Sequence, residues 1–148
     1  METEIYKNIK GYNKITDIFG YWPSFHDAEV LSVQIERDKD NGPTVSAKIH
    51  VFEMKAKGIL KSKFDFIKHS IVSILFGEVR QIDLNCFDNQ NPIFDLDISD
   101  NANEEMAQFK VVFNGASEFG FSFICNNIEV ISVERKIPDY SIYNNDKL

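Results

Sequence analysis

The fold of this chain is decided by one stretch near its N-terminus, LSVQIERDKDNGPTVSAKIHV, which spans residues 31–51. Apolar side chains occupy every second position in both of its halves, from Leu31 to Ile35 and again from Val45 to Val51. Alternation with a period of two is typical of a strand with one buried face. Residues 38–43 between the halves are rich in Asp, Asn, Gly and Pro, which favour turns. The stretch therefore predicts a β-hairpin.

Strand-like patterns continue along the rest of the chain. A largely apolar run at residues 71–76, in which Ser73 is the one polar residue, ends at Gly77 and predicts a central strand covered on both faces. The Lys-rich residues 55–68 predict a loop that leads into a strand. Short connections favour antiparallel neighbours, so we expect an α+β protein that is mostly β, with about eight strands in a large curved antiparallel sheet or a sandwich. The further alternating runs are residues 82–86, 94–98, 109–113, 119–125 and 128–133.

The first twenty residues differ from the rest because their apolar positions recur at steps of three and four. This spacing predicts an N-terminal helical segment interrupted at Gly11, with Asn13 as a cap and Gly20 at the C-terminal end. We expect the helix to close one end of the core. The chain, residues 1–148, is expected to form a single domain, with residues 138–148 as a loosely held polar tail.

Composition limits the classes of partner. The chain has 23 acidic and 16 basic residues and a net charge of −7, whereas nucleic acids and anionic membranes are bound through an excess of Lys and Arg. No apolar run approaches the ~18–20 residues that cross a bilayer, and residues 1–10 lack a signal-peptide core. We interpret Cys86 and Cys125, which fall in strand-like runs, as reduced core thiols. The protein is therefore expected to be cytoplasmic.

The negative charge is concentrated in residues 81–109. This segment holds seven acids and no Lys or Arg, while the remainder of the chain has 16 acids and 16 bases. On a strand, Asp95 and Asp97 must point the same way. Three interpretations of these acidic residues stay open. They form a solvated face that discourages edge pairing, a surface for a basic protein partner, or a calcium site. For the calcium site, the spacing of the acidic residues does not fit an EF-hand loop. The residues expected to contact a partner are Asp83, Asp95, Asp97, Asp100, Glu104 and Glu105.

The loop after Gly20 is the most individual stretch, and its Pro23 excludes a helix. In one interpretation His26 and Asp27, together with Glu29, form a metal site or the acid–base pair of a small metal-dependent or small-molecule enzyme. The histidines elsewhere lie in strand-like runs without HxH, HxxxH or HExxH spacing. We therefore expect no metal, cofactor or catalytic residue. A small enzyme centred on His26, Asp27 and Glu29 is the alternative interpretation.

The other interpretation of the loop is structural. Trp22 and Phe25 then fill the end of the sheet, because large aromatic rings are stabilised by burial. Asp27 then hydrogen-bonds His26 or nearby backbone amides. A nucleic-acid stacking platform on the Phe-rich run 119–123 is not expected, because residues 111–134 contain no Lys or Arg. The residues assigned to the structural motif are Trp22, Pro23, Phe25, His26 and Asp27.

The sequence FGYWPSFHDAEV, residues 19–30, resembles the hallmark of a bacterial immunity-protein family of polymorphic-toxin systems. The similarity covers about residues 18–98, and WPSFHD, residues 22–27, is its specific part. The resemblance implies a small cytosolic protein that neutralises a cognate toxin, often a nuclease, and it brings no catalytic residues. An acidic surface suits this role because many nucleases present basic clefts. The interpretation as a non-catalytic structural or oligomeric protein also stays open, and the sequence does not determine the oligomeric state.

Overall fold

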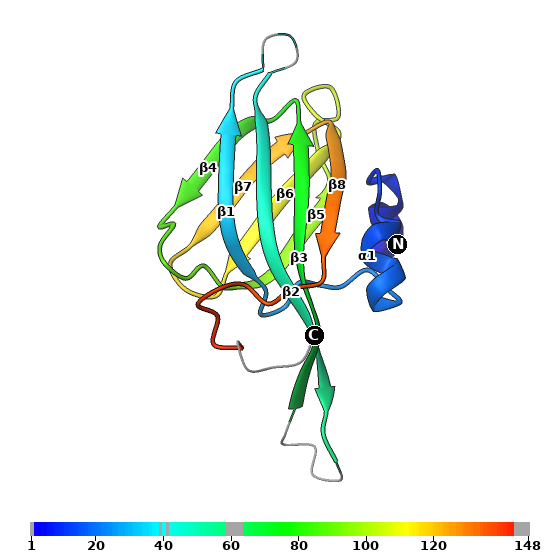
Figure 1. Ribbon diagram of the computed structural model, residues 1–148. Helices are drawn as coiled ribbons and strands as arrows, with labels where there is room; N and C mark the ends of the chain where they lie inside the picture. The colour runs from blue at the N-terminus through cyan, green and yellow to red at the C-terminus, as the bar shows by residue number, and fades with distance from the viewer. Residues whose placement is uncertain (1, 39, 41, 59–63, 144–148) are drawn as a thin grey trace.

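The computed structural model describes residues 2–38, 40, 42–58 and 64–143. In this part of the chain eight strands form two antiparallel sheets that face each other as a sandwich (Figure 1). The predicted mostly β, antiparallel architecture is confirmed, and of the two arrangements expected it is the sandwich. Sheet A contains, in spatial order, β1 (Glu29–Glu36), β2 (Thr44–Ala56), β3 (Phe64–Gly77) and β8 (Asn127–Glu134). Sheet B contains β4 (Arg80–Asn85), β7 (Gly120–Cys125), β6 (Phe109–Gly115) and β5 (Ile93–Asp100).

The core lies between the two sheets and is rich in phenylalanine. The ring of Phe76 on β3 is 4.8 Å from that of Phe123 on β7, so the two sheets meet through aromatic contacts. Fully burying such a side chain stabilises the fold by about 1.5–3 kcal/mol. The inward positions of the predicted hairpin are at most 1% exposed: Val45, Ala47, Ile49 and Val51.

Strand β3 lies inside sheet A, between β2 and β8, as predicted for a central strand. Its Ile74 and Phe76 are buried in the core, but Ser73 and Leu75 on the other face are only half-buried. The predicted cover on both faces is therefore wrong. In an antiparallel sandwich one face of each sheet packs on the core and the other is left open.

Strands β2 and β3 are longer than predicted and extend beyond the sandwich as a two-stranded arm (Figure 1). β1 pairs with β2 only as far as His50, and β8 pairs with β3 only as far as Ile71. Farther out, residues 53–56 pair only with residues 64–67. The Lys-rich residues 55–68, predicted as a loop before a strand, are therefore strand on both sides of a centre that lies outside the described residues.

The N-terminal segment consists of the 3₁₀-helix η1 (Glu2–Asn8) and the helix α1 (Asn13–Phe19), and it lies beside β8 (Figure 1). The Lys10 N–H donates to the carbonyl of Ile128 at 3.0 Å, and the Val130 N–H donates to the carbonyl of Lys10 at 2.8 Å. The segment's buried Ile9, Ile15 and Phe19 belong to the core, so the segment closes the core at one side, where closure of one end was expected. The segment also covers the edge strand β8 of sheet A. The physical reason is that an edge strand has unpaired backbone groups that need partners.

The C-terminal end of α1 agrees with the prediction, and its N-terminal end does not. Gly20 ends the helix with a left-handed φ of 85°, and its N–H donates to the Thr16 carbonyl at 2.7 Å, as predicted. Asn13 is not the cap: it is the first helical residue, and Tyr12 stands at the N-cap without a side-chain cap bond. No helix in the described ranges is long and apolar enough to span a membrane.

One residue predicted to be in the core, Cys86, lies on the surface, and so does Phe94, which begins an alternating run. Cys125 is a buried free thiol, and burial raises its pKa to about 12, but Cys86 is exposed. Cys86 follows the last residue of β4 with a φ of 53°, so the chain turns out of the sheet there. Phe94 is 55% exposed although Leu96 is buried. The register of β5 shifts between Ile93 and Asp95, which turns Phe94 out of the alternation.

Candidate functional site

The loop between α1 and β1 joins the two sheets through backbone hydrogen bonds. The Asp27 N–H donates to the carbonyl of Ile93 at 3.0 Å, and the Ile93 N–H donates back to the carbonyl of Ala28 at 2.9 Å. The Leu96 N–H donates to the carbonyl of Ser24 at 3.2 Å. The start of sheet A is therefore fastened to the first strand residues of β5 in sheet B.

The aromatic side chains of this loop pack inward and toward the N-terminal segment. Phe25 is 1% exposed, and its backbone is left-handed with a φ of 64°. Trp22 is half-buried between the parallel ring of Tyr6, at 5.5 Å, and the edge of Phe25, at 5.7 Å. Asp27 also has a left-handed φ, of 62°. Such backbone conformations cost about 1–3 kcal/mol each and persist where surrounding contacts hold them.

The three residues of the enzyme interpretation are only partly brought together. His26 Nε2 lies 3.4 Å from the Asp27 carboxylate, and His26 Nδ1 lies 3.0 Å from the carbonyl of Phe94. Because a carbonyl only accepts, Nδ1 carries the proton of that bond. Glu29 instead accepts a hydrogen bond from the Asn91 N–H at 3.3 Å. Within the described residues there is no group of three or more His, Cys, Asp or Glu that could hold a metal ion.

Asn91 is a structural residue that the sequence did not single out. It is 2% exposed, and its side-chain amide donates to the carbonyls of Val30, at 3.2 Å, and Asp88, at 2.8 Å. Its side-chain oxygen accepts from the Asp88 N–H at 2.7 Å. The only signal in the sequence is its place before Pro92 in the short turn NQNPI, residues 89–93.

The acidic residues on the strands share the outer face of sheet B. Asp97 is opposite Val112, which is opposite Ser122, which is opposite Asp83. The two carboxylates thus lie in one row across the sheet, at its two lateral edges. Asp95 lies on the same face as Asp97, two residues away on β5.

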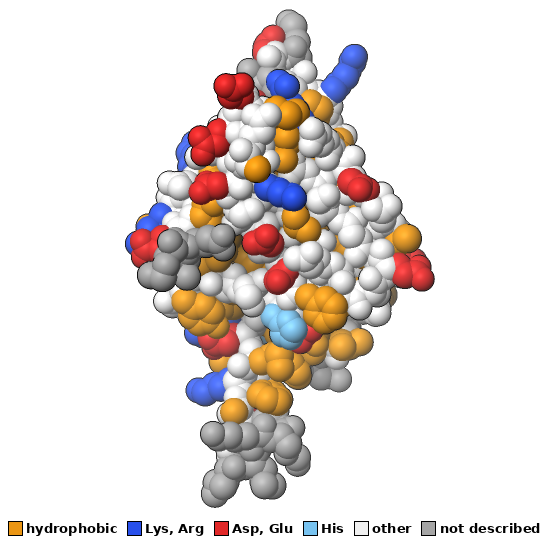
Figure 2. Space-filling model, turned by 180° about the vertical axis from the view of Figure 1, so that it is seen from behind, with side chains coloured by type: hydrophobic (Ala, Val, Ile, Leu, Met, Phe, Trp, Pro, Cys, Tyr) orange, Lys and Arg blue, Asp and Glu red, His pale blue; other side chains and the backbone are white. Residues whose placement is uncertain are grey.

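Basic side chains interrupt this acidic face. In the next row Lys110 is opposite Ser99 on one side and Ile124 on the other, and Ile124 is opposite Arg80. Figure 2 shows acidic side chains spread over this side of the molecule with basic and hydrophobic ones among them. Asp100, Glu104 and Glu105 lie beyond this face, at the end of β5 and in the following loop, where all three are exposed.

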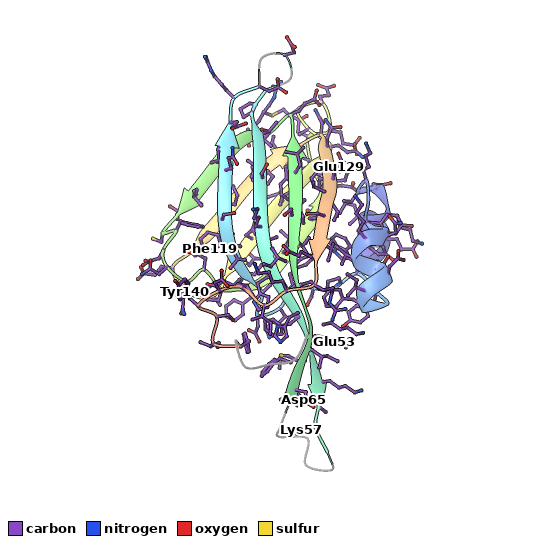
Figure 3. All side chains as sticks on the ribbon, viewed as in Figure 1. Glu53, Lys57, Asp65, Phe119, Glu129 and Tyr140 are labelled. Carbon is purple, nitrogen blue, oxygen red and sulfur yellow. The ribbon has the colours of Figure 1, made fainter. Side chains whose placement is uncertain are left out.

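The base of the arm is tied to the loop and carries ionic contacts. Glu53 accepts a hydrogen bond from the Tyr21 hydroxyl at 2.7 Å, and Lys68 Nζ lies 3.3 Å from its carboxylate. These partners lower the pKa of Glu53. Farther out, Lys57 and Asp65 face each other across the arm at 3.6 Å (Figure 3). An isolated hairpin is marginal in water, so the contacts at its base support the projecting strands.

A buried histidine pair on the outer face of sheet A was also missed by the sequence analysis. His50 Nε2 lies 3.0 Å from His69 Nδ1, and His69 Nε2 lies 3.0 Å from the carbonyl of Phe66. Burial and the neighbouring His69 lower the pKa of His50 to about 4. Tyr143 covers the pair, with its ring 5.4 Å from that of His69 and 5.0 Å from that of Phe52.

Tyr143 belongs to the segment Pro138–Tyr143, the described part of the predicted polar tail. In Figure 1 this segment crosses the lower ends of β1 and β2. A cavity of about 330 Å³ lies between the segment and sheet A, and Glu29, His50 and Phe52 are among its lining residues. We refer to it as the outer cavity. The sequence alone could not predict this cavity, because its walls come from parts of the chain that are far apart: the strands, the 89–92 turn and this segment.

The comparison with family models agrees with the resemblance found in the sequence. The model described as Immunity protein 50 matches residues 11–136, which include the loop and all eight strands. No curated protein and no solved structure matches the chain. The resemblance to an immunity-protein family is confirmed by a match over most of the chain. The protein therefore belongs to the Immunity protein 50 family.

Proposed function

We propose that this protein binds a cognate bacterial toxin in the cytoplasm and neutralises it by protein–protein contact, without chemistry of its own. The observation that carries the proposal is the family match over residues 11–136. The function implied by the family description is immunity, which requires a surface for a partner rather than a catalytic centre. A toxin of a polymorphic-toxin system, for example a nuclease, fits the proposal.

The outer face of sheet B is the contact surface that we propose. Asp83, Asp95 and Asp97 supply negative charge on this face, and the exposed Asp100, Glu104 and Glu105 extend it beyond the end of β5. Such a surface complements a basic cleft and would accelerate encounter with the toxin.

The row that contains Lys110 and Arg80 adds directionality to this surface. A toxin docked in a reversed orientation would bring its basic groups against these two cations. Like-charge juxtaposition disfavours wrong orientations and wrong partners. The mixed face would therefore contribute to orientation and specificity as well as to the association rate.

Co-expression tests the function directly. The protein is produced together with the toxin encoded beside it, and survival of the host cells and formation of a complex are measured. Survival with a stable one-to-one complex is the expected result. Cells that die despite abundant folded protein, with no complex recovered, would refute the proposal. A complex that forms while the host cells still die would refute neutralisation but would support binding of the toxin.

A further inference from the structure

The outer cavity has the size of a ligand site. Its volume of about 330 Å³ lies at the lower end of the range of roughly 300–1,000 Å³ found for small-molecule pockets. Leu31, His50 and Phe52 of sheet A form part of its walls, and Tyr140 and Tyr143 contribute from the opposite segment. Tyr140 is labelled in Figure 3, where its segment passes over the β1 side of the sheet.

The charge of the outer cavity is negative. Three acidic residues are among those that line it, Asp27, Glu29 and Asp139, and no Lys or Arg is among the described lining residues. Glu29 is half-buried, and burial raises its pKa because the charged form loses water. Among the described residues, only the Asn91 N–H donates a hydrogen bond to its carboxylate, at 3.3 Å. A cation beside Glu29 would compensate its lost hydration.

The histidine pair leaves a hydrogen-bond acceptor on His50, one of the residues that line this cavity. The Phe66 carbonyl can only accept, so His69 carries its proton on Nε2, and its Nδ1 is the acceptor in the neutral pair. His50 must then donate from Nε2 to His69. Its other nitrogen, Nδ1, keeps a lone pair and has no hydrogen-bond partner among the described residues. His50 is only 1% exposed and is among the residues that line the cavity, so a donor bound there would give this buried acceptor a partner.

Aromatic rings supply the remaining recognition. Phe52 and Tyr143 lie with ring centroids 5.0 Å apart at the cavity, and Tyr140 also lines it. Aromatic faces attract organic cations through their quadrupole. Carboxylates, a nitrogen acceptor and aromatic faces together match a positively charged group that only donates hydrogen bonds. Ammonium and guanidinium groups have this property.

We propose that the outer cavity binds an organic cation, an alkylammonium or guanidinium group on a short apolar stem. Two sources can present this group: a free amine, or a Lys or Arg side chain of the toxin inserted during binding. The second source rests on the proposed function. A metal ion fits less well, because the described residues hold no cluster of three or more metal-ligating side chains.

Titration monitored by two-dimensional amide NMR tests the proposal. The probes are n-butylammonium chloride and methylguanidinium chloride, with 1-butanol as the neutral analogue and sodium chloride as the ionic-strength control. We expect saturable shifts at Glu29, Leu31, His50 and residues 139–143 with either cation. The two controls are expected to leave these amides unshifted, apart from small linear changes with salt.

Matched variants assign the binding to the cavity carboxylates. Glu29→Gln with Asp139→Asn retains size and the acceptor for Asn91 while removing two charges, and it should weaken cation binding at least tenfold. Asp83→Asn with Asp97→Asn removes two charges from sheet B and should bind the cations as the unmodified protein does. No saturable shift with either cation, equal shifts with 1-butanol, or unchanged binding by the first variant would overturn the proposal.

The toxin distinguishes the two sources. If a toxin side chain is the ligand, Glu29→Gln/Asp139→Asn loses at least tenfold in toxin affinity, and n-butylammonium competes with the toxin. If a free amine is the ligand, the variant binds the toxin normally while losing the small cations. Neutralisation of the toxin without any cation binding would overturn the cavity proposal and leave the proposed function intact. Cation binding without neutralisation of the toxin would refute the proposed function and leave the cavity proposal intact.

Discussion

Asn91 and Val30 are joined by a reciprocal pair of hydrogen bonds although 61 positions separate them in the chain. The Asn91 side-chain amide donates to the Val30 carbonyl at 3.2 Å, and the Val30 N–H donates to the Asn91 carbonyl at 3.0 Å. Both residues are at least 98% buried. The pair therefore links the beginning of sheet A to the turn between β4 and β5 of sheet B, at a buried place where water cannot replace the lost bonds.

Asn91→Ala is expected to destabilise the protein by about 1–3 kcal/mol, because it leaves the buried carbonyl of Val30 and two part-buried backbone groups of Asp88 without their partner. The midpoint and slope of urea unfolding measure this change. The control is Asn89→Ala, an exposed position in the same turn, which should stay within about 0.5 kcal/mol of the unmodified protein. Equal stabilities of the two variants would contradict the role of Asn91.

Gly11→Ala is expected to cost more stability than Gly20→Ala. Both glycines have a left-handed φ, of 76° and 85°, which costs an L-residue about 1–2 kcal/mol. A Cβ on Gly11 would also lie 2.7 Å from the Val130 carbonyl oxygen, whereas a Cβ on Gly20 would meet nothing within 4 Å. Thermal unfolding of both variants provides the comparison. A lower or equal cost at Gly11 would mean that the N-terminal segment does not hold the β8 edge as the structure indicates.

His50 should make the protein less stable as the pH falls. Its pKa is lowered from 6.5 to about 4 on folding, so between these values the unfolded state binds a proton that the folded state does not. Stability is unaffected above pH 6.5 and falls by at most about 1.4 kcal/mol per pH unit between pH 6.5 and 4. Urea unfolding at a series of pH values measures this slope.

His50→Gln cannot titrate in this window and should flatten the slope between pH 6.5 and about 4. Ser32→Ala, which replaces an exposed side chain of β1 that does not titrate, should leave the slope unchanged. Glu53, whose pKa is lowered mainly by the Tyr21 hydroxyl, loses its stabilising ionised form at still lower pH. Its contribution is common to all three proteins, so the difference between their slopes isolates His50. An unaltered slope in His50→Gln would contradict the prediction.

Asp95→Lys with Asp97→Lys is expected to reduce the association rate with the toxin by about tenfold or more and to weaken its dependence on salt. Stopped-flow association at several ionic strengths measures both. Asp17→Lys with Glu134→Lys makes the same change in net charge at exposed positions outside sheet B and should have a smaller effect. If the two double variants behave alike, overall charge rather than the proposed face governs the encounter.

Trp22→Ala separates a packing role from a surface contact. Trp22 is half-buried between Tyr6 and Phe25, so we expect a loss of about 2–3 kcal/mol, below the ~3–5 kcal/mol typical of fully buried aromatic residues. Tyr140→Ala, at a side chain 98% exposed, should leave the unfolding free energy nearly unchanged. Unchanged stability in Trp22→Ala would instead assign this ring to a contact surface.

Local pattern was sufficient to predict most strands but not their irregularities. The hairpin of residues 31–51 and the run 109–113 follow from alternation, because burial of one face imposes a period of two. Phe94 fits the same pattern and is nevertheless exposed, since the register shifts between Ile93 and Asp95. The extension of β2 and β3 into an arm was missed because its Lys-rich strands lie beyond the core and bury few apolar residues.

The amino-acid pattern alone was enough to determine a mostly β antiparallel protein, a confined acidic segment and the resemblance to an immunity-protein family, because alternation, charge and a short motif are local properties. Tertiary structure decided the rest. It places Asp83 and Asp97 in one row across sheet B, pairs His50 with His69 under Tyr143, and forms the outer cavity between strands and residues 138–143. These relationships depend on strand order, register and the path of the chain over the sheets, which are set by packing between residues far apart in the sequence.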